Sequence, residues 1–200
     1  MSFQLSLEKI KDVKYLPLGD VCKICIGINI PWSLQGDSGL PIVKSENIRN
    51  GRIVTGNLNY CNRENYPDAE VIKYGDVVMI RKGRVGEVWI NLTDREFFFN
   101  EKLFKFTANK DILSSRYLYC FFLSLSKRIP MHVVSGVKKI RKSDLERLLI
   151  PIPSLKDQEM IVKDLDRFCE NRCREFCEGY FATTTHNELL LPELNLFLSI

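Results

Sequence analysis

The chain has no long run of apolar residues. None of its 200 residues lies in a stretch that reaches the roughly 18 apolar positions of a membrane span. Residues 1–17 gain charge too early for a secretion signal, so we expect a cytoplasmic protein that does not associate with a membrane. The net charge of +4 is small, and a nucleic-acid partner must therefore be argued from local basic clusters.

Catalytic motifs are also scarce. There is no Gly-x-x-x-x-Gly-Lys-Ser/Thr phosphate loop, and no Asn- or Asp-Pro-Pro-aromatic tetrapeptide of the base-flipping amino-methyltransferases. The Pro-Asp step at 67–68 with Glu70 and Lys73 superficially resembles a nuclease pattern, but its spacing is wrong. His132 and His186 have no sequence neighbour that indicates a triad or metal site. We expect a non-catalytic chain with no cofactor and no metal, acting beside a separate enzyme.

Seven cysteines could indicate disulfides or zinc. The odd number and the missing secretion signal favour reduced thiols. Cys22 and Cys25 lie in a β-branched run, and Cys169, Cys173 and Cys177 recur along one face of a predicted helix. We favour buried, apolar cysteines, because free Cys is among the most buried residue types. A zinc-stabilised interaction domain for which DNA is irrelevant stays open as an alternative.

Residues 15–106 are rich in β-strand signals. Short apolar runs alternate with Gly, Asn and Asp turn signals, which predicts an antiparallel or mixed sheet, or one that closes in part into a barrel. The runs are Val21–Ile26, Leu40–Val43, Val77–Ile80, Glu87–Ile90, Phe97–Phe99 and Leu103–Phe106.

Helical patterns dominate the second half of the chain. Arg116–Lys127 is apolar on most sides and predicts a buried helix. Ser143–Glu146 fits a capping box for a short helix. After the strand-like run Leu148–Ile150 and two prolines, Ser154 is a candidate N-cap of a long amphipathic helix, and Gly179 its candidate C-cap.

Together these patterns predict an α/β (α+β) fold in three parts: a β-rich domain with packed helices at 13–152, a projecting helix at 153–179, and an apolar tail of unknown role at 180–200. The helix carries an incomplete apolar seam that could pair two chains or fold back on its own domain. The candidate interface residues are Ile161, Leu165, Phe168, Arg172 and Phe176.

Four segments, in the same order, resemble the DNA-specificity subunit of type I restriction–modification systems. They are Tyr15–Asp20, Gly39–Gly51, Gly75–Gly86 and Ile150–Val162. The last matches the element I-P-x-P-x-L-x-x-Q-x-x-I-V, which in that family joins a target-recognition domain to a spacer helix. Family members carry two recognition domains and two spacer helices, so the resemblance implies a half-length form that acts as a homodimer through its helix.

Two basic clusters are the strongest candidates for DNA contact, because arginine grips guanine edges and lysine neutralises phosphate. Asparagines near the Asn50-Gly51 step could read adenine, although Asn-Gly is also an ordinary hairpin turn. The candidate DNA-binding residues are Lys44, Asn47, Arg49, Asn50, Arg81, Lys82, Arg84, Lys138, Lys139, Arg141 and Lys142.

The resemblance implies a reader of one half-site in double-stranded DNA. It would direct a separate methyltransferase subunit and a separate endonuclease subunit, which use S-adenosylmethionine and ATP; this chain is expected to bind neither. A spacer helix of about 36 Å would match roughly one turn of B-DNA. A recognition module or truncated product of a longer restriction–methylation protein is the alternative.

Overall fold

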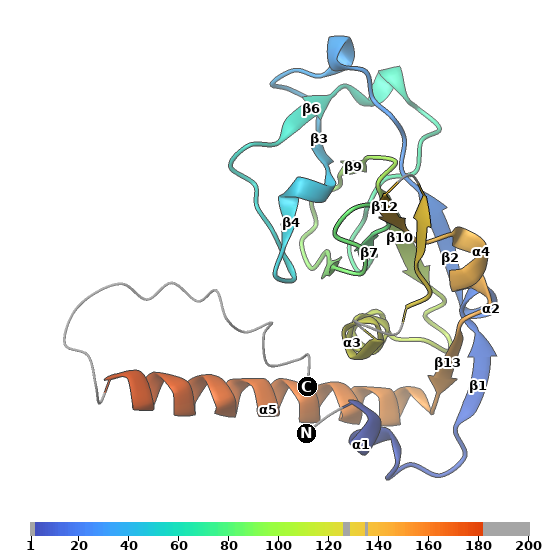
Figure 1. The fold of residues 1–200 in the computed structure, drawn as a ribbon, viewed down its shortest axis with the longest axis vertical. Helices are drawn as coiled ribbons and strands as arrows, with labels where there is room; N and C mark the ends of the chain where they lie inside the picture. Colours follow the sequence, from blue (N-terminus) through green and yellow to red (C-terminus); the bar gives the residue numbers. More distant parts are fainter. Residues whose placement is uncertain (1–2, 126–128, 135, 182–200) are drawn as a thin grey trace.

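The computed structural model describes residues 3–125, 129–134 and 136–181. A β-rich body stands above one long helix, which runs across its base and projects to one side (Figure 1). The strands are β1 (Lys14–Pro17), β2 (Cys22–Ile26), β3 (Leu40–Val43), β4 (Ile48–Arg49), β5 (Arg52–Ile53), β6 (Asn59–Cys61), β7 (Val77–Ile80), β8 (Val88–Ile90), β9 (Phe98–Phe99), β10 (Leu103–Ala108), β11 (His132–Val134), β12 (Val137–Lys139) and β13 (Leu149–Ile152).

Helices connect and cover these strands. They are α1 (Phe3–Leu7), α2 (Leu18–Val21), α3 (Ser115–Leu125), α4 (Lys142–Glu146) and α5 (Leu155–Phe181), with 3-10 turns η1 (Trp32–Leu34), η2 (Ser45–Asn47) and η3 (Arg63–Asn65). The predicted α/β fold is confirmed. None of the helices in the described ranges is both long and apolar enough to cross a membrane.

An antiparallel sheet with the order β2-β10-β7-β8 forms the centre of the body. Every residue of β7 is buried, because the sheet is covered on both faces. Val77 and Met79 pack into the cluster that contains α3, whereas Val78 and Ile80 pack into a second cluster with Phe97 and Phe99. This explains why the run is continuously apolar instead of alternating.

A second sheet, with the order β6-β3-β9, lies beyond that face. Strand β3 pairs antiparallel with β6 and parallel with β9, so the predicted mixed β structure is confirmed. Strand β3 covers the predicted run Leu40–Val43, and β7 covers Val77–Ile80.

Helix α3 links the body to its base. The Phe122 ring packs 4.7 Å from that of Phe106 in the central sheet. The Tyr117 hydroxyl donates a 2.8 Å hydrogen bond to the carbonyl oxygen of Pro151 in β13, and burial raises the pKa of this phenol. The predicted buried helix is thus confirmed.

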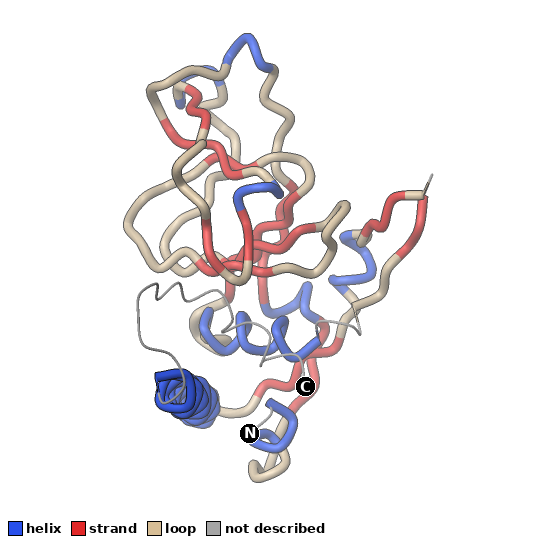
Figure 2. The backbone as a smooth tube through the Cα atoms, turned by 60° about the vertical axis from the view of Figure 1, so that its left-hand side comes forward, coloured by secondary structure: helices blue, strands red, loops and turns tan. Residues whose placement is uncertain are grey.

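The two ends of the body meet in a ribbon of β1 and β13, in which Tyr15 lies opposite Pro151. Helix α5 then starts after Ser154, whose Oγ accepts a 3.2 Å bond from the Asp157 N–H, so the predicted N-cap is confirmed. Helix α5 runs through Gly179 and ends at Phe181, so the predicted C-cap is wrong. Figure 2 views α5 almost along its axis, with α3 and α1 beside it.

The capping box predicted at Ser143–Glu146 is also wrong. Arg141 is the N-cap of α4, and it makes no capping bond through its side chain. The Asp144 carboxylate instead lies 2.8 Å from His132 Nε2 and 3.1 Å from Arg147 Nη2. Both groups hold the pKa of Asp144 below its usual range, His132 more strongly. The carboxylate therefore joins α4 to the β11–β12 hairpin.

Candidate nucleic-acid interface

The two basic clusters predicted from the sequence lie side by side in the structure. Gly83 N–H donates to the carbonyl oxygen of Lys138 at 3.1 Å, and Ile140 N–H donates to that of Arg81 at 3.0 Å. Lys82 and Lys139 face each other in the resulting antiparallel bridge. Gly83 has φ = +84°, a backbone conformation that favours glycine. The turn after β7 and strand β12 therefore form one backbone surface.

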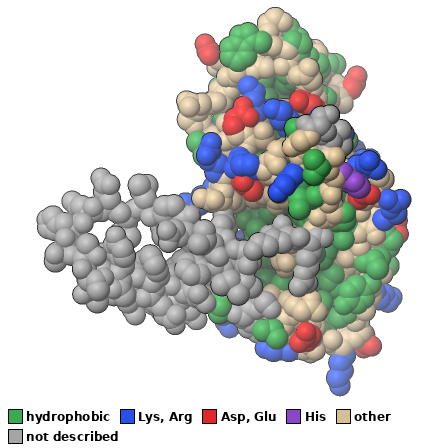
Figure 3. All heavy atoms as spheres, in the orientation of Figure 1, with side chains coloured by type: hydrophobic (Ala, Val, Ile, Leu, Met, Phe, Trp, Pro, Cys, Tyr) green, Lys and Arg blue, Asp and Glu red, His purple; other side chains and the backbone are tan. Residues whose placement is uncertain are grey.

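Four cations of this surface have no acidic partner within the described part of the chain: Lys82, Lys138, Lys139 and Arg141. Lys142 differs, because its Nζ lies 3.4 Å from Glu146 Oε1 in an exposed pair. An exposed pair of this kind is weak. We call these five residues the lysine surface. Figure 3 shows several Lys and Arg side chains, with some Asp and Glu among them, across the middle of the visible face.

Arg81 and Arg84 make their contacts within the domain. Arg81 is buried; its Nη1 donates to the carbonyl oxygen of Glu101 at 2.9 Å, and its guanidinium lies 5.1 Å from the Phe104 ring centroid. Burial lowers its pKa. Arg84 binds Glu87 at 2.8 Å and also donates to the carbonyl oxygens of Ser45 (2.7 Å) and Ile48 (2.8 Å). These contacts argue against the DNA contacts predicted for both arginines.

The β4–β5 hairpin begins at Ile48, whose carbonyl oxygen accepts a hydrogen bond from Arg84. Asn50 has φ = +50° and Gly51 φ = +68°, as the two central residues of a type I′ turn require. Arg49 therefore lies directly opposite Arg52, and both side chains are exposed. The Arg49 Nε donates to the carbonyl oxygen of Glu46 at 3.4 Å. Arg52 is not among the DNA-binding residues predicted from the sequence, although an Asn-Gly turn places the flanking residues opposite each other.

Asn47 secures the base of this hairpin. It is buried, and its Oδ1 accepts the Lys44 N–H at 2.9 Å. Its carbonyl oxygen accepts the Val54 N–H at 2.7 Å, and its Nδ2 lies 3.5 Å from the carbonyl oxygen of Val54. The base contact predicted for Asn47 is therefore inconsistent with its position. The Lys44 ammonium donates to Gln35 Oε1 at 3.1 Å, away from the hairpin tip, and lies 5.8 Å from the Trp32 ring.

The predicted helix interface is used inside the chain. Ile161 is 2% and Leu165 7% exposed, and both belong to the core cluster that includes α3. Arg116 reinforces this packing with two bonds to the Asp166 carboxylate, at 2.8 and 2.9 Å. This burial in the chain's own core argues against partner contacts through Ile161 and Leu165. Phe168 is half-buried. The side chains of Arg172 and Phe176 lie outside the described residues, as does the tail from residue 182.

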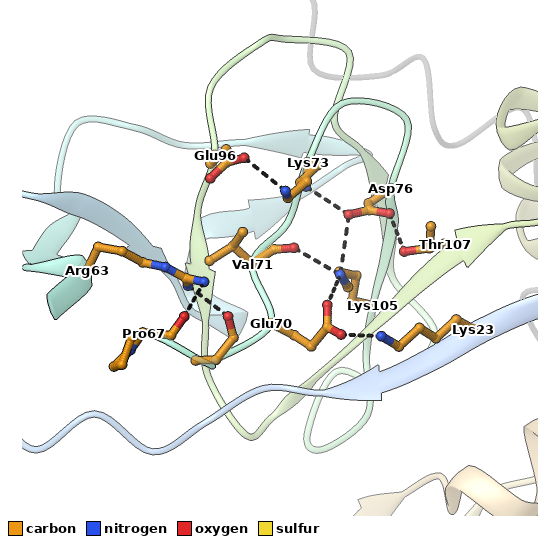
Figure 4. A network of polar contacts seen from close by, with 11 residues as sticks. Lys23, Arg63, Pro67, Glu70, Val71, Lys73, Asp76, Glu96, Lys105 and Thr107 are labelled. Atoms are coloured by element: carbon orange, nitrogen blue, oxygen red, sulfur yellow. Dashed lines mark hydrogen bonds and ion pairs between the residues drawn. The ribbon is translucent and has the colours of Figure 1, made fainter. Parts of the chain in front are cut away.

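A buried lysine organises the region of the apparent nuclease pattern (Figure 4). Lys105 Nζ donates to Glu70 Oε2 at 2.8 Å and to the Val71 carbonyl oxygen at 2.9 Å, and it lies 3.6 Å from Asp76 Oδ2. Hydrogen bonds from Lys105 and then Lys23 lower the pKa of Glu70 to about 2. The acidic groups are neutralised within the fold.

The other member of that pattern, Lys73, points to Glu96 at 3.4 Å and not to the Glu70 carboxylate. Across the described ranges, no three His, Cys, Asp or Glu side chains are arranged to hold a metal ion. The network therefore stabilises the packing of β10 against the 70–76 loop.

The cysteine pair of β2 is not a metal site. Cys22 and Cys25 are three residues apart in a strand, so their side chains point to opposite faces. Cys22 lies in the core, where burial raises the pKa of its thiol to about 12, and Cys25 is partly exposed. The side chains of Cys169, Cys173 and Cys177 lie outside the described residues. The geometry of β2 argues against the zinc alternative for the first pair.

Residues 10–174 match the protein family described as type I restriction modification DNA specificity domain. Among solved structures, a chain from a study of complex assembly and conformational transition of the type I restriction–modification system aligns with a TM-score of 0.71 and 19% identity, over 98% of this chain and 49% of that one. The HsdS subunit from Thermoanaerobacter tengcongensis aligns with a TM-score of 0.69 and 20% identity, over 98% and 46%.

The type I S subunit from M. genitalium aligns with a TM-score of 0.58 and 18% identity, over 89% of this chain and 44% of that one. A search of curated protein sequences gives no match. The sequence described here thus spans about half the length of the solved chains that it resembles.

Proposed function

This chain belongs to the type I restriction modification DNA specificity domain family, and from that premise we propose that it binds double-stranded DNA and reads one half-site. One observation supports the proposal above the others. The Gly83–Lys138 bond joins two basic segments into one surface whose lysines lack acidic partners within the described residues, Lys142 excepted. A cluster of cations without acidic partners is typical of a surface that binds a polyanion such as DNA.

The lysine surface would mainly bind phosphate. Each phosphate contact releases counterions, so the logarithm of affinity should fall with the logarithm of salt by about 0.9 per contact. Such contacts fix position and orientation on the duplex but carry little sequence information. Recognition of bases must come from other side chains, which reach into a groove of the DNA.

We propose no catalytic role for this chain. Among the described side chains, Glu70 and Asp76 are paired with Lys105 inside the fold. Methyl transfer and cleavage would come from separate methyltransferase and endonuclease subunits. Its contribution would be to place those subunits on the chosen sequence. This assignment of partners rests on family membership.

We also propose that two copies associate through the projecting part of α5. The 27 residues of the helix give a length of about 40 Å, close to one turn of B-DNA at roughly 34–36 Å. Ile161 and Leu165 are occupied by the chain's own core, so the contacts would fall from Phe168 onward, where Arg172 and Phe176 remain predictions. Two-fold pairing would make the target a pair of mirrored blocks.

Selection of the full chain on randomised duplex DNA tests these proposals, with and without its methyltransferase subunit, at near-physiological salt. Mirrored blocks at a fixed spacing are expected. A single asymmetric block would keep the reader and exclude the symmetric pair. No enrichment in either mixture would contradict sequence reading. The doubly substituted Lys138→Ala/Lys139→Ala protein should lose affinity, whereas the control Lys110→Ala/Lys156→Ala, at exposed positions elsewhere, should not.

A further inference from the structure

We propose that Arg49 and Arg52, at the tip of the β4–β5 hairpin, enter the major groove and read guanine, while the lysine surface holds phosphate. This inference rests on the proposed DNA binding and assigns its sequence specificity to one pair of side chains. The pair consists of two arginines on a separate hairpin, whereas four of the five residues of the lysine surface are lysines. Arg81 is buried, and Arg84 is held by Glu87 and two backbone carbonyl oxygens, whereas Arg49 makes one long contact, from its Nε to the Glu46 carbonyl oxygen at 3.4 Å, and both Arg49 and Arg52 are exposed.

The hairpin has the shape that a groove requires. Paired strands lie about 4.8 Å apart, and a two-stranded ribbon fits a major groove about 12 Å wide. The two-residue turn of Asn50 and Gly51 makes the tip as narrow as a hairpin allows. Arg49 and Arg52 flank this turn, so both side chains leave the backbone next to the leading end of the ribbon.

The charges of the tip indicate an electronegative partner. Arg49 and Arg52 are directly opposed in the antiparallel register, and like charges so placed destabilise a hairpin. No acidic side chain in the described ranges pairs with either of them. The planar guanidinium of an arginine can donate two hydrogen bonds to the O6 and N7 acceptors of guanine. Binding to a guanine edge would therefore offset the repulsion between Arg49 and Arg52.

The base of the hairpin is fixed before any ligand arrives. Asn47 bonds to both flanks of the hairpin through Lys44 and Val54. From the other side, Arg84 donates to the carbonyl oxygens of Ser45 and Ile48. A hairpin anchored in this way loses little conformational freedom on binding. The same arginine belongs to the turn that contacts β12, so the tip keeps a fixed relation to the lysine surface.

Modified bases provide the test. After selection with the full wild-type chain, each guanine of the enriched motif is replaced in turn by 7-deazaguanine, which lacks the N7 acceptor of the major groove. In parallel it is replaced by hypoxanthine, which lacks the N2 amino group of the minor groove. For the wild-type chain, 7-deazaguanine should weaken binding roughly 5- to 150-fold at one or two positions. Hypoxanthine should have little effect there.

Two double variants with equal charge loss separate reading from attachment. Arg49→Ala/Arg52→Ala should show no further penalty from 7-deazaguanine and should select a motif relaxed at those positions. Lys138→Ala/Lys139→Ala should bind more weakly to every sequence but keep the 7-deazaguanine penalty. Should the alanine hairpin fail to fold by circular dichroism, Arg49→Lys/Arg52→Lys keeps the charge and removes the fork.

The outcomes distinguish this inference from the proposed function. An unchanged motif and an unchanged 7-deazaguanine penalty in the hairpin variants would overturn the arginine reading and leave DNA recognition intact. A motif without guanine, or a penalty from hypoxanthine alone, would also overturn it. The absence of any motif for the wild-type chain would overturn both proposals together.

Discussion

Gly83 donates its backbone N–H to the carbonyl oxygen of Lys138 at 3.1 Å, and this bond aligns two basic segments that lie far apart in the sequence. The bond depends on a backbone conformation, φ = +84° at Gly83, that side-chain-bearing residues rarely adopt. The position of the charges can therefore be disturbed without removing any charge.

The Gly83→Ala variant should separate these two effects. We expect a loss of about 1 kcal/mol in the free energy of unfolding and a several-fold loss of DNA affinity, with the net charge unchanged. Thermal unfolding and titration with DNA would measure the two. Gly56→Ala is the matched control, because Gly56 is exposed and has no neighbouring atom within 4 Å of an added Cβ. Equal DNA affinity in the two variants would mean that the bridge does not organise the DNA surface.

Removal of lysines should change the salt dependence of binding by a countable amount. Replacing Lys138 and Lys139 with alanine should lower the log–log salt slope by about 0.9 for each phosphate that the variant no longer binds. Fluorescence anisotropy over a range of potassium chloride concentrations measures the slope. Lys110→Ala/Lys156→Ala removes the same charge from exposed positions elsewhere and should leave the slope unchanged. The same decrease in both variants would indicate an unspecific effect of net charge.

Gln158 connects the long helix α5 to the β-rich body through hydrogen bonds. It is fully buried; its Oε1 accepts the Ser114 N–H at 2.8 Å, and its Nε2 donates to the carbonyl oxygens of Ile112 (2.8 Å) and Pro153 (3.0 Å). The Gln158→Leu variant leaves these groups without partners, so we expect a loss of about 3 kcal/mol in stability. Denaturant unfolding and hydrogen exchange at the 112–114 turn would measure it. The exposed neighbour Met160, changed to Ala, should cost little.

Local sequence signals were sufficient for most elements of the body. Leu40–Val43 and Val77–Ile80 are apolar runs closed by Gly or polar residues, and the structure has strands at these positions. The family resemblance was carried by turns and by the proline-rich junction, which are also local features. The two-residue turn at Asn50-Gly51 is a third case, since its chemistry alone requires positive φ.

The contacts of individual polar side chains could not be predicted from local sequence. Arg81, Arg84 and Asn47 look like surface residues in the sequence, but each bonds to backbone groups that the fold brings to it. The carbonyl oxygen of Glu101 is supplied 20 residues away from Arg81, and that of Ser45 is 39 residues away from Arg84. The same limit applies to Ile161, whose apolar side chain fits a partner helix or its own core equally well in a sequence pattern.

The Glu70–Lys105 pair should make the domain sensitive to acid. Two lysine hydrogen bonds depress the pKa of the folded carboxyl from 4.5 to about 2. Its contribution to stability is therefore complete above the unfolded pKa and is lost as the pH falls from about 5 to about 2. The Glu70 side chain is 41% exposed, so solvent screening reduces this contribution, and we expect about 1–2 kcal/mol.

The Glu70→Gln variant should therefore be less stable than the wild type near pH 7 and equally stable near pH 2. The two curves of unfolding free energy against pH should converge as the wild-type carboxyl gains its proton. Urea unfolding at several pH values would trace both curves. Glu64→Gln is the charge-matched control, because Glu64 is exposed in η3, and its curve should follow the wild type. Parallel curves for Glu70→Gln and wild type down to pH 2 would show that the buried Lys105 is compensated by Asp76 and the Val71 carbonyl alone.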